Sequence, residues 1–180
     1  EADGWTYAAV GVIDAVEPAN GHYGTLVTIS GERLLGGGST TDSVTLGGEE
    51  VDSVVSEDAA AIVVVAAAGD SSSGADVVII SDTGAVVSGS DVWEYIGPGV
   101  IESVAPAEGQ DQTRLTISGS SLLGGGESYE TITLAGVEAN IVAGEGDNNA
   151  VVVVANSGTP HLGSIVIVSS SGAIVQKENA

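Results

Sequence analysis

A shift of 88 residues lays the sequence over itself without a gap, and 35 of the 88 paired positions are identical. Residues 11–21, GVIDAVEPANG, lie over residues 99–109, GVIESVAPAEG, and TLVTISGERLLGGG lies over TRLTISGSSLLGGG. The later segments VTLGGEE and VVIISDTGAVV also have partners in the second half. Self-similarity of this length is typical of duplicated structural units. The chain therefore consists of two copies of one unit, preceded by four residues.

The apolar residues of both copies favour strands. Phe, Met and Cys are absent, and most of the 43% hydrophobic content is Val, Ile, Leu and Ala. Val and Ile are branched at Cβ, which suits a pleated sheet better than a helix. In TRLTISG the charged Arg114 marks the solvent-exposed face of the strand, which places Leu115 and Ile117 on the buried face. Their equivalents in the first copy, Val27 and Ile29, are expected to be buried as well. About seven short strands per copy, separated by Gly-rich and Ser-rich turns, predict an immunoglobulin-like β-sandwich.

Acidic residues dominate the charge of the chain. Twenty-five carboxylates are balanced only by Arg33, Arg114 and Lys177, which gives a formal net charge of -22. Such a surface repels phosphate backbones and anionic lipid headgroups, and no run of about twenty apolar residues is present to span a bilayer. We therefore expect no nucleic-acid partner and no membrane insertion. The charge suits a salty or calcium-rich exterior where counterions screen repulsion, so we expect an extracellular or cell-surface location.

The order of the motifs resembles that of the IPT/TIG domain. Each copy has GVI-x-x-V-x-P, then T-x-x-TISG-x-x-L-x-GG, then a T-L-x-G segment. This immunoglobulin-like family occurs in plexins, Rel-type transcription factors and large surface proteins, and the resemblance implies two tandem IPT/TIG β-sandwiches. The expected domains are residues 8–95 and residues 96–180, with residues 1–7 resembling the end of a preceding repeat. The basic loops of the DNA-binding members are missing here, which excludes a DNA-binding role.

An aromatic pair occurs twice, as Trp5 with Tyr7 and as Trp93 with Tyr95. The resemblance implies that such a pair closes the last strand of a domain. The second copy stops at QKENA, before a pair of its own. Three explanations stay open. The 180 residues are a window from a longer tandem array, or the N-terminal segment of one subunit completes the second domain of its neighbour by strand addition, or Trp5 and Tyr7 fold back on the first domain.

The connection between the two copies is short, with the residues IGPG following the second aromatic pair. A short connection that contains proline predicts domains held nearly end to end as a stiff rod. At such a junction we expect aromatic residues to pack between domains or subunits rather than to stack on sugar rings. The residues predicted to serve assembly or interdomain packing are Trp5, Tyr7, Trp93, Tyr95 and Pro98.

Motifs for catalysis are missing. His22 and His161 do not occupy paired positions, and both lie in predicted loops, so we interpret them as solvated. The chain has no Cys and no Gly-x-Ser-x-Gly sequence. The GGGST at residues 36–40 lacks the Lys that a phosphate-binding loop requires. We therefore expect a protein that is not an enzyme and has no cofactor.

Acidic clusters are weak candidates for calcium binding, because Ca²⁺ takes about six to eight oxygen ligands from carboxylates and carbonyls. None of them has the spacing of an EF-hand loop, so we interpret them as solvated faces that attract Ca²⁺ diffusely or at contacts between subunits. The clusters are Glu49, Glu50 and Asp52, then Glu57 with Asp58, and Glu145 with Asp147.

Sugars could be attached only through hydroxyl groups, because no Asn-x-Ser/Thr sequence occurs. Ser and Thr residues in predicted turns are candidates for O-linked glycosylation, although turn propensity explains the same residues. These candidates are Thr40, Thr41, Ser71, Ser72 and Ser73.

Together these features predict a non-enzymatic extracellular structural protein, a rod-like repeat module or the subunit of a filament or adhesive stalk. Its expected partner is itself, as a head-to-tail polymer or as neighbouring repeats. Two other functions stay open. One is a surface module that binds a carbohydrate or protein ligand, and the other is an accessory domain of a secreted polysaccharide-degrading enzyme.

Overall fold

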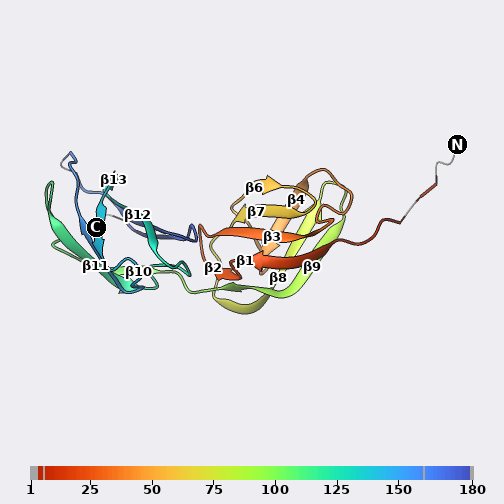
Figure 1. Ribbon diagram of the computed structural model, residues 1–180, viewed down its shortest axis with the longest axis horizontal. Coiled ribbons are helices and arrows are strands. Elements are labelled where there is room, and N and C mark those ends of the chain that lie inside the picture. The colour runs from red at the N-terminus through yellow and green to blue at the C-terminus, as the bar shows by residue number, and fades with distance from the viewer. Residues whose placement is uncertain (1–3, 6, 160, 179–180) are drawn as a thin grey trace. The chain divides into compact units, whose positions relative to one another are not determined.

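The computed structural model describes residues 4, 5, 7–159 and 161–178. Every regular secondary-structure element in this part of the chain is a β-strand, which confirms the predicted all-β class (Figure 1). The chain divides into two compact units between Tyr95 and Ile96. Two short loops of the first half, Gly21–Thr25 and Ala68–Ser71, group with the second unit.

Two antiparallel sheets of unit 1 form a sandwich. One sheet has the order β1-β3-β7-β6 and the other has the order β2-β9-β8-β4-β5. The strands are β1 (Val12–Glu17), β2 (Asn20–Gly21), β3 (Leu26–Glu32), β4 (Thr41–Leu46), β5 (Glu49–Glu50), β6 (Ser53–Glu57), β7 (Ala61–Val65), β8 (Ser72–Ser81) and β9 (Val86–Tyr95).

Unit 2 repeats this arrangement, without a described counterpart of β2, in the sheets β10-β11-β15-β14 and β13-β12-β16-β17. The predicted tandem immunoglobulin-like fold is thus confirmed. The strands are β10 (Val100–Ala105), β11 (Arg114–Ser120), β12 (Tyr129–Leu134), β13 (Val137–Glu138), β14 (Asn140–Ala143), β15 (Ala150–Val154), β16 (Ile165–Ser169) and β17 (Ile174–Lys177).

The alternation predicted for β3 and β11 is present. Val27 and Ile29 are fully buried in unit 1, and Leu115 and Ile117 are buried in unit 2, while Arg114 is exposed. The buried side chains belong to two separate hydrophobic cores, one in each unit. Each sandwich therefore has a core of its own.

The structure corrects the gap-free register of the repeat at two strands, β14 and β15. Val27 pairs with Val64 in unit 1, whereas Leu115 pairs with Val153 in unit 2, so that β7 and β15 differ by 89 residues. Strands β6 and β14 differ by 87, and β8 and β16 differ by 88 again. The turn after β14 is thus two residues longer than the turn after β6. A comparison of sequences misses this shift because both segments are runs of Val and Ala, where a slip of one residue changes the number of matches very little.

The glycine of the repeated TISG motif allows β1 to approach β3. A Cβ added at Gly31 would overlap the carbonyl oxygen of Val12, and one added at Gly119 would overlap that of Val100. Both sites lie beside a bulge at the same place in β1 and β10. The close approach of the two backbones therefore requires glycine in both copies.

The aromatic pair of β9 lies in the core of unit 1. Trp93 and Tyr95 are 1% and 2% exposed, and their rings meet edge to face at 85° with centroids 5.5 Å apart. Trp93 pairs with Ala75 of β8. Strands β8 and β9 each have ten residues, whereas β16 has five and β17 has four. At one end of the second sandwich the strands β16 and β17 are therefore shorter than the equivalent strands β8 and β9 of the first.

The substitution Trp93→Ala should lower the free energy of unfolding of unit 1 by about 3–5 kcal/mol, because truncating a buried aromatic side chain leaves a cavity. Urea denaturation followed by circular dichroism measures the loss, and hydrogen exchange in β3 and β11 separates the two units. Trp5→Ala is the matched control. Because Trp5 is 82% exposed, its loss should change the stability of the monomeric chain by less than about 0.5 kcal/mol. Equal losses from both substitutions would contradict the placement of Trp93 in the core.

Candidate functional site

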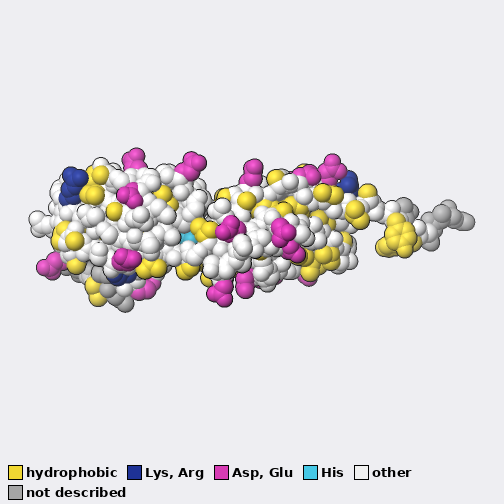
Figure 2. All heavy atoms as spheres, turned by 90° about the horizontal axis from the view of Figure 1, so that it is seen from below, with side chains coloured by type: hydrophobic (Ala, Val, Ile, Leu, Met, Phe, Trp, Pro, Cys, Tyr) yellow, Lys and Arg dark blue, Asp and Glu magenta, His cyan; other side chains and the backbone are white. Residues whose placement is uncertain are grey.

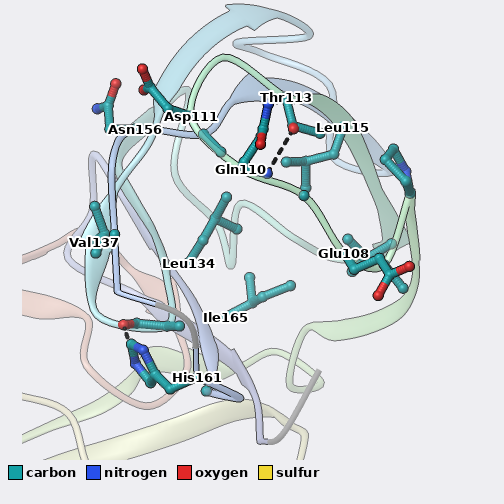
Figure 3. Close-up of a pocket in the computed structure, with 18 of the residues that line it drawn as sticks. Glu108, Gln110, Asp111, Thr113, Leu115, Leu134, Val137, Asn156, His161 and Ile165 are labelled. Atoms are coloured by element: carbon teal, nitrogen blue, oxygen red, sulfur yellow. Dashed lines mark hydrogen bonds between the residues drawn. The ribbon is translucent and has the colours of Figure 1, made fainter.

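Unit 2 has a pocket of about 690 Å³ that opens at one end of its sandwich (Figure 3). The walls come from residues 106–111 and Thr113 after β10, from the turn between β12 and β13, and from residues 155–159 and 161–163 before β16. The side chains of Leu115, Leu134 and Ile165 point into the pocket from three different strands. The floor is therefore apolar and belongs to both sheets.

Polar side chains surround the opening of this pocket. They are Glu108, Gln110, Asp111, Asn156 and His161. The Asn156 side chain donates a hydrogen bond to the carbonyl oxygen of Glu138 at 2.7 Å, and Nε2 of His161 lies 3.1 Å from the carbonyl oxygen of Ala135. Contacts with the backbone thus hold both side chains at the rim. The described lining contains two carboxylates and no Lys or Arg, so it disfavours anionic ligands.

The corresponding place in unit 1 is filled by the aromatic pair of β9. A Cβ added at Gly47 would meet the ring of Tyr95 at 3.4 Å. Burial, with a smaller contribution from the charge of Glu49, raises the pKa of Tyr95 to about 12. The equivalents of Gly47 and Glu49 are Ala135 and Val137, and both line the pocket of unit 2. The pocket therefore occupies the position that Tyr95 fills in unit 1.

The loop that borders this position has the same conformation in both copies. The amide of Thr25 donates to the carbonyl oxygen of His22 at 3.0 Å, and the amide of Thr113 donates to that of Gln110 at 3.0 Å. Each threonine hydroxyl also accepts a hydrogen bond from the amide of the residue three positions earlier. The same hydrogen bonds thus hold this loop in both copies.

Two backbone hydrogen bonds hold the end of β9 against this loop. The amide of Glu94 donates to the carbonyl oxygen of Ala19, and the amide of Ile96 donates to that of Gly21, both at 2.9 Å. The equivalent of Gly21 is Gly109, and no backbone amide in the described part of unit 2 donates to its carbonyl oxygen. In unit 1 the equivalent acceptor binds the backbone directly after Tyr95.

The burial of equivalent core residues in the two units shows how far Trp93 and Tyr95 shield the core of unit 1 from solvent. Leu46 and Ala66 are fully buried in unit 1. Their equivalents Leu134 and Ala155 are only partly buried, and both line the pocket. The core of unit 2 is thus less covered at the pocket than the same region of unit 1.

The N-terminal aromatic pair repeats the geometry of the buried one. The rings of Trp5 and Tyr7 meet edge to face at 87° with centroids 6.0 Å apart. Trp5 is 82% exposed and Tyr7 is 88% exposed, so the alternative that this pair folds back on the first domain does not hold. The segment joins the body of unit 1 where Nε of Arg33 donates to the carbonyl oxygen of Val10 at 3.0 Å.

The other residues predicted for assembly lie in two different environments. Trp93 and Tyr95 belong to the core of unit 1, and Pro98 is exposed in the connection that follows β9. A role for these three residues in packing between domains or subunits stays a prediction.

The predicted calcium candidates lie on the surface. Within the described ranges, no group of three or more His, Cys, Asp or Glu side chains is placed to hold a metal ion. Two of the carboxylates accept hydrogen bonds from hydroxyl groups, Glu50 from Ser43 at 2.7 Å and Glu57 from Thr41 at 2.5 Å. The face drawn in Figure 2 carries many scattered acidic side chains and few basic ones. Glu57 is half-buried, and the exposed candidates are Glu49, Glu50, Asp52, Asp58, Glu145 and Asp147.

The hydroxyl groups considered for O-linked sugars differ in exposure. Thr41 is half-buried and its hydroxyl donates to Glu57, whereas the others are exposed. Glycosylation at these positions stays a prediction. The exposed residues are Thr40, Ser71, Ser72 and Ser73.

The interpretation of both histidines as solvated holds for His161 and is wrong for His22. His161 is exposed. His22 is buried, because the loop that carries it packs within the second compact unit. This burial lowers the pKa of His22, against a smaller opposing effect of the Tyr23 carbonyl. The neighbouring residues in the sequence, Gly21 and Tyr23, do not indicate that His22 is buried.

Residues 12–95 match the family described as the IPT/TIG domain. The match covers the strands of unit 1 and bears out the resemblance seen in the motifs. IPT/TIG is a non-catalytic immunoglobulin-like domain, and unit 2 repeats its architecture. No curated protein sequence matches the chain. None of the described residues forms a helix that is long and apolar enough to cross a bilayer.

Solved structures of low sequence identity share the fold. The extracellular region of plexin A4, domains 1 to 10, is 18% identical with a TM-score of 0.59, over 97% of this chain and 15% of that chain. Another structure of this region, with domains 1 to 8, is 19% identical with a TM-score of 0.56, over 97% and 18%. SGBP-B from a complex xyloglucan utilization locus in Bacteroides uniformis is 16% identical with a TM-score of 0.40, over 95% and 49%. The chain thus spans about half or less of these proteins, and the likeness to plexin A4 concerns the fold alone.

Raising the pH from about 10 to about 12 should lower the free energy of unfolding of unit 1. The pKa of Tyr95 is raised to about 12 by burial, so the unfolded chain loses this proton at a lower pH than the folded one. The stabilisation is complete below about pH 10 and is lost as the pH rises through about 12. Urea denaturation at a series of pH values, with hydrogen exchange to separate the units, measures the change.

Tyr95→Phe should remove most of this pH dependence from unit 1. The same substitution should leave the alkaline loss in unit 2, where burial raises the pKa of Tyr129 to about 12. An unchanged slope for unit 1 in Tyr95→Phe would refute the assignment to Tyr95.

Proposed function

Because residues 12–95 belong to the IPT/TIG family, we propose that the protein is a non-enzymatic extracellular structural subunit that assembles head to tail through its N-terminal segment. It forms a filament or stalk, and its partner is a second copy of itself. The observation that carries this proposal is the exposed pair Trp5 and Tyr7, whose ring geometry repeats that of the buried pair Trp93 and Tyr95.

The physical support is the cost of leaving these side chains in water. Trp and Tyr each bury about 150–250 Å² when they pack, which corresponds to a gross gain of about 4–6 kcal/mol per ring before the entropy of association is subtracted. The equivalent pair in unit 1, Trp93 and Tyr95, is almost completely buried. A segment built like an end strand but exposed in the single chain is suited to strand addition on another copy.

The charge of the chain supports an extracellular location and an ordered mode of assembly. A net charge of -22 disfavours contact between arbitrary faces of two copies. A specific contact that buries two aromatic side chains overcomes this repulsion, whereas unspecific contacts do not. Growth then proceeds along one direction, which is what a filament requires.

The pocket of unit 2 favours a second candidate function, the binding of a carbohydrate ligand. Its volume of about 690 Å³ lies in the range of about 300–1,000 Å³ that small-molecule sites have, and Gln110 and Asn156 place amide groups at the rim. The described lining contains no Trp, Tyr or Phe to stack on a sugar ring. A glycan array with the variant lacking residues 1–7 tests this candidate, and saturable binding of one glycan would favour it.

Deleting residues 1–7 should abolish assembly while both units stay folded, because the deletion removes Trp5 and Tyr7 and leaves every strand from β1 to β17 in place. Light scattering coupled to size exclusion measures the mass of the particles, and electron microscopy shows whether fibres form. A variant with Trp5→Ser and Tyr7→Ser is the matched control for chain length and should behave like the deletion. Unchanged assembly of either variant would refute the role of the segment.

Assembly should strengthen with ionic strength. Raising NaCl from about 0.01 M to about 0.15 M shortens the Debye length from about 30 Å to about 8 Å, which weakens the repulsion between copies that each carry a charge of -22. Sedimentation at a series of NaCl and CaCl₂ concentrations measures the effect. Equal assembly at equal ionic strength indicates screening, whereas a loss of assembly with added NaCl would contradict this prediction.

A further inference from the structure

The pocket of unit 2 corresponds to the volume that an aromatic pair fills in unit 1. Ala135 and Val137 line the pocket, and their equivalents Gly47 and Glu49 lie beside Tyr95. We propose that this pocket is the acceptor for the N-terminal segment of a second copy, with Trp5 and Tyr7 taking the places that Trp93 and Tyr95 have in unit 1. This inference rests on the proposed head-to-tail assembly. It specifies the site that accepts the N-terminal segment and the residues that pair there.

The internal repeat specifies the register. The shift of 88 residues places Trp5 on Trp93, Tyr7 on Tyr95 and Ala8 on Ile96. In unit 1 the amide of Ile96 donates to the carbonyl oxygen of Gly21. In the proposed complex the amide of Ala8 donates to the carbonyl oxygen of Gly109.

The ring positions follow from the same equivalence. In unit 1 Trp93 pairs with Ala75, and an added Cβ at Gly47 would meet the side chains of both Ala75 and Tyr95. In unit 2 Gly163 and Ala135 are the equivalents, and they contact each other in the same way. Trp5 of the incoming copy therefore lies beside Gly163, and Tyr7 lies over Ala135.

The chemistry of the pocket suits this occupant. Leu115, Leu134 and Ile165 present apolar side chains to the incoming rings. The exchange of Glu49 in unit 1 for Val137 in unit 2 removes a carboxylate from the wall that a tyrosine ring covers. The new contact would also cover Leu134 and Ala155, which are fully buried at the equivalent positions of unit 1.

A chain extended with its own copy of the aromatic segment tests the acceptor. Ala180 corresponds to Val92, so that appending Trp-Glu-Tyr-Ile-Gly, the sequence of residues 93–97, continues the repeat in register. The added residues should fill the pocket of their own chain. Assembly should then be lost although Trp5 and Tyr7 are intact, and hydrogen exchange should show stronger protection of β12 and β16. The matched control carries Ser-Glu-Ser-Ile-Gly and should assemble as the parent chain does.

A cross-link measures the register directly, since the chain has no cysteine of its own. Ala8→Cys combined with Gln110→Cys should give a ladder of disulfide-linked oligomers under mild oxidation, because Ala8 is predicted to lie beside the loop of Gly109. Ala8→Cys combined with Glu102→Cys is the control, with an exposed cysteine on β10 that does not line the pocket. The yield of linked dimers should be at least about tenfold lower for this control, as expected when effective concentration depends on geometry.

The outcomes separate the inference from the proposed function. Loss of assembly in the aromatic extension alone, with the ladder in the Gln110 variant, supports both. If removal of Trp5 and Tyr7 abolishes assembly while the aromatic extension does not, the acceptor lies elsewhere and the inference is overturned, although the proposed function stands. If the parent chain does not assemble at any salt concentration, both fail. A native polypeptide that continues beyond Ala180 with its own Trp-x-Tyr pair, or a monomer that buries Trp5 in its own pocket, would also overturn the inference.

Discussion

The edge-to-face contact of Trp93 with Tyr95 closes one end of the first sandwich. Two sheets that face each other expose apolar side chains wherever the space between them reaches solvent. In unit 1 two rings on β9 cover that space, and Leu46 and Ala66 behind them are fully buried. In unit 2 the same sheets and the same loop surround a pocket instead. The proposed role of the chain therefore depends on which residues cover this second opening.

Much of the fold could be predicted because the repeat supplies an internal control. The exchange of Leu26 for Arg114 at paired positions identified the wet face of a strand, and the buried face followed. The two-residue difference after β14 could not be predicted, since the Val-rich runs of β7 and β15 match almost equally well in either register. The burial of His22 could not be predicted either, because it depends on packing of a loop within a unit distant in sequence.

The candidate site was only half visible in the sequence. The repeated motif, Trp5 with Tyr7 and Trp93 with Tyr95, indicated which residues share a role. The pocket itself required the structure, because its walls come from segments before β11, after β12 and before β16, which meet only through the sheets. The exchange of Glu49 for Val137 could be interpreted only from the structure, which places Glu49 near Tyr95 and Val137 in the lining of the equivalent pocket.

The turn that follows β14 has a practical consequence for protein engineering. Two copies of one sandwich keep the same strand pairing although this turn differs by two residues between them. The fold thus tolerates a change of length there without losing its register. Foreign epitopes or fluorescent labels inserted between Gly144 and Asn149 would decorate the protein at a turn that does not line the pocket of unit 2.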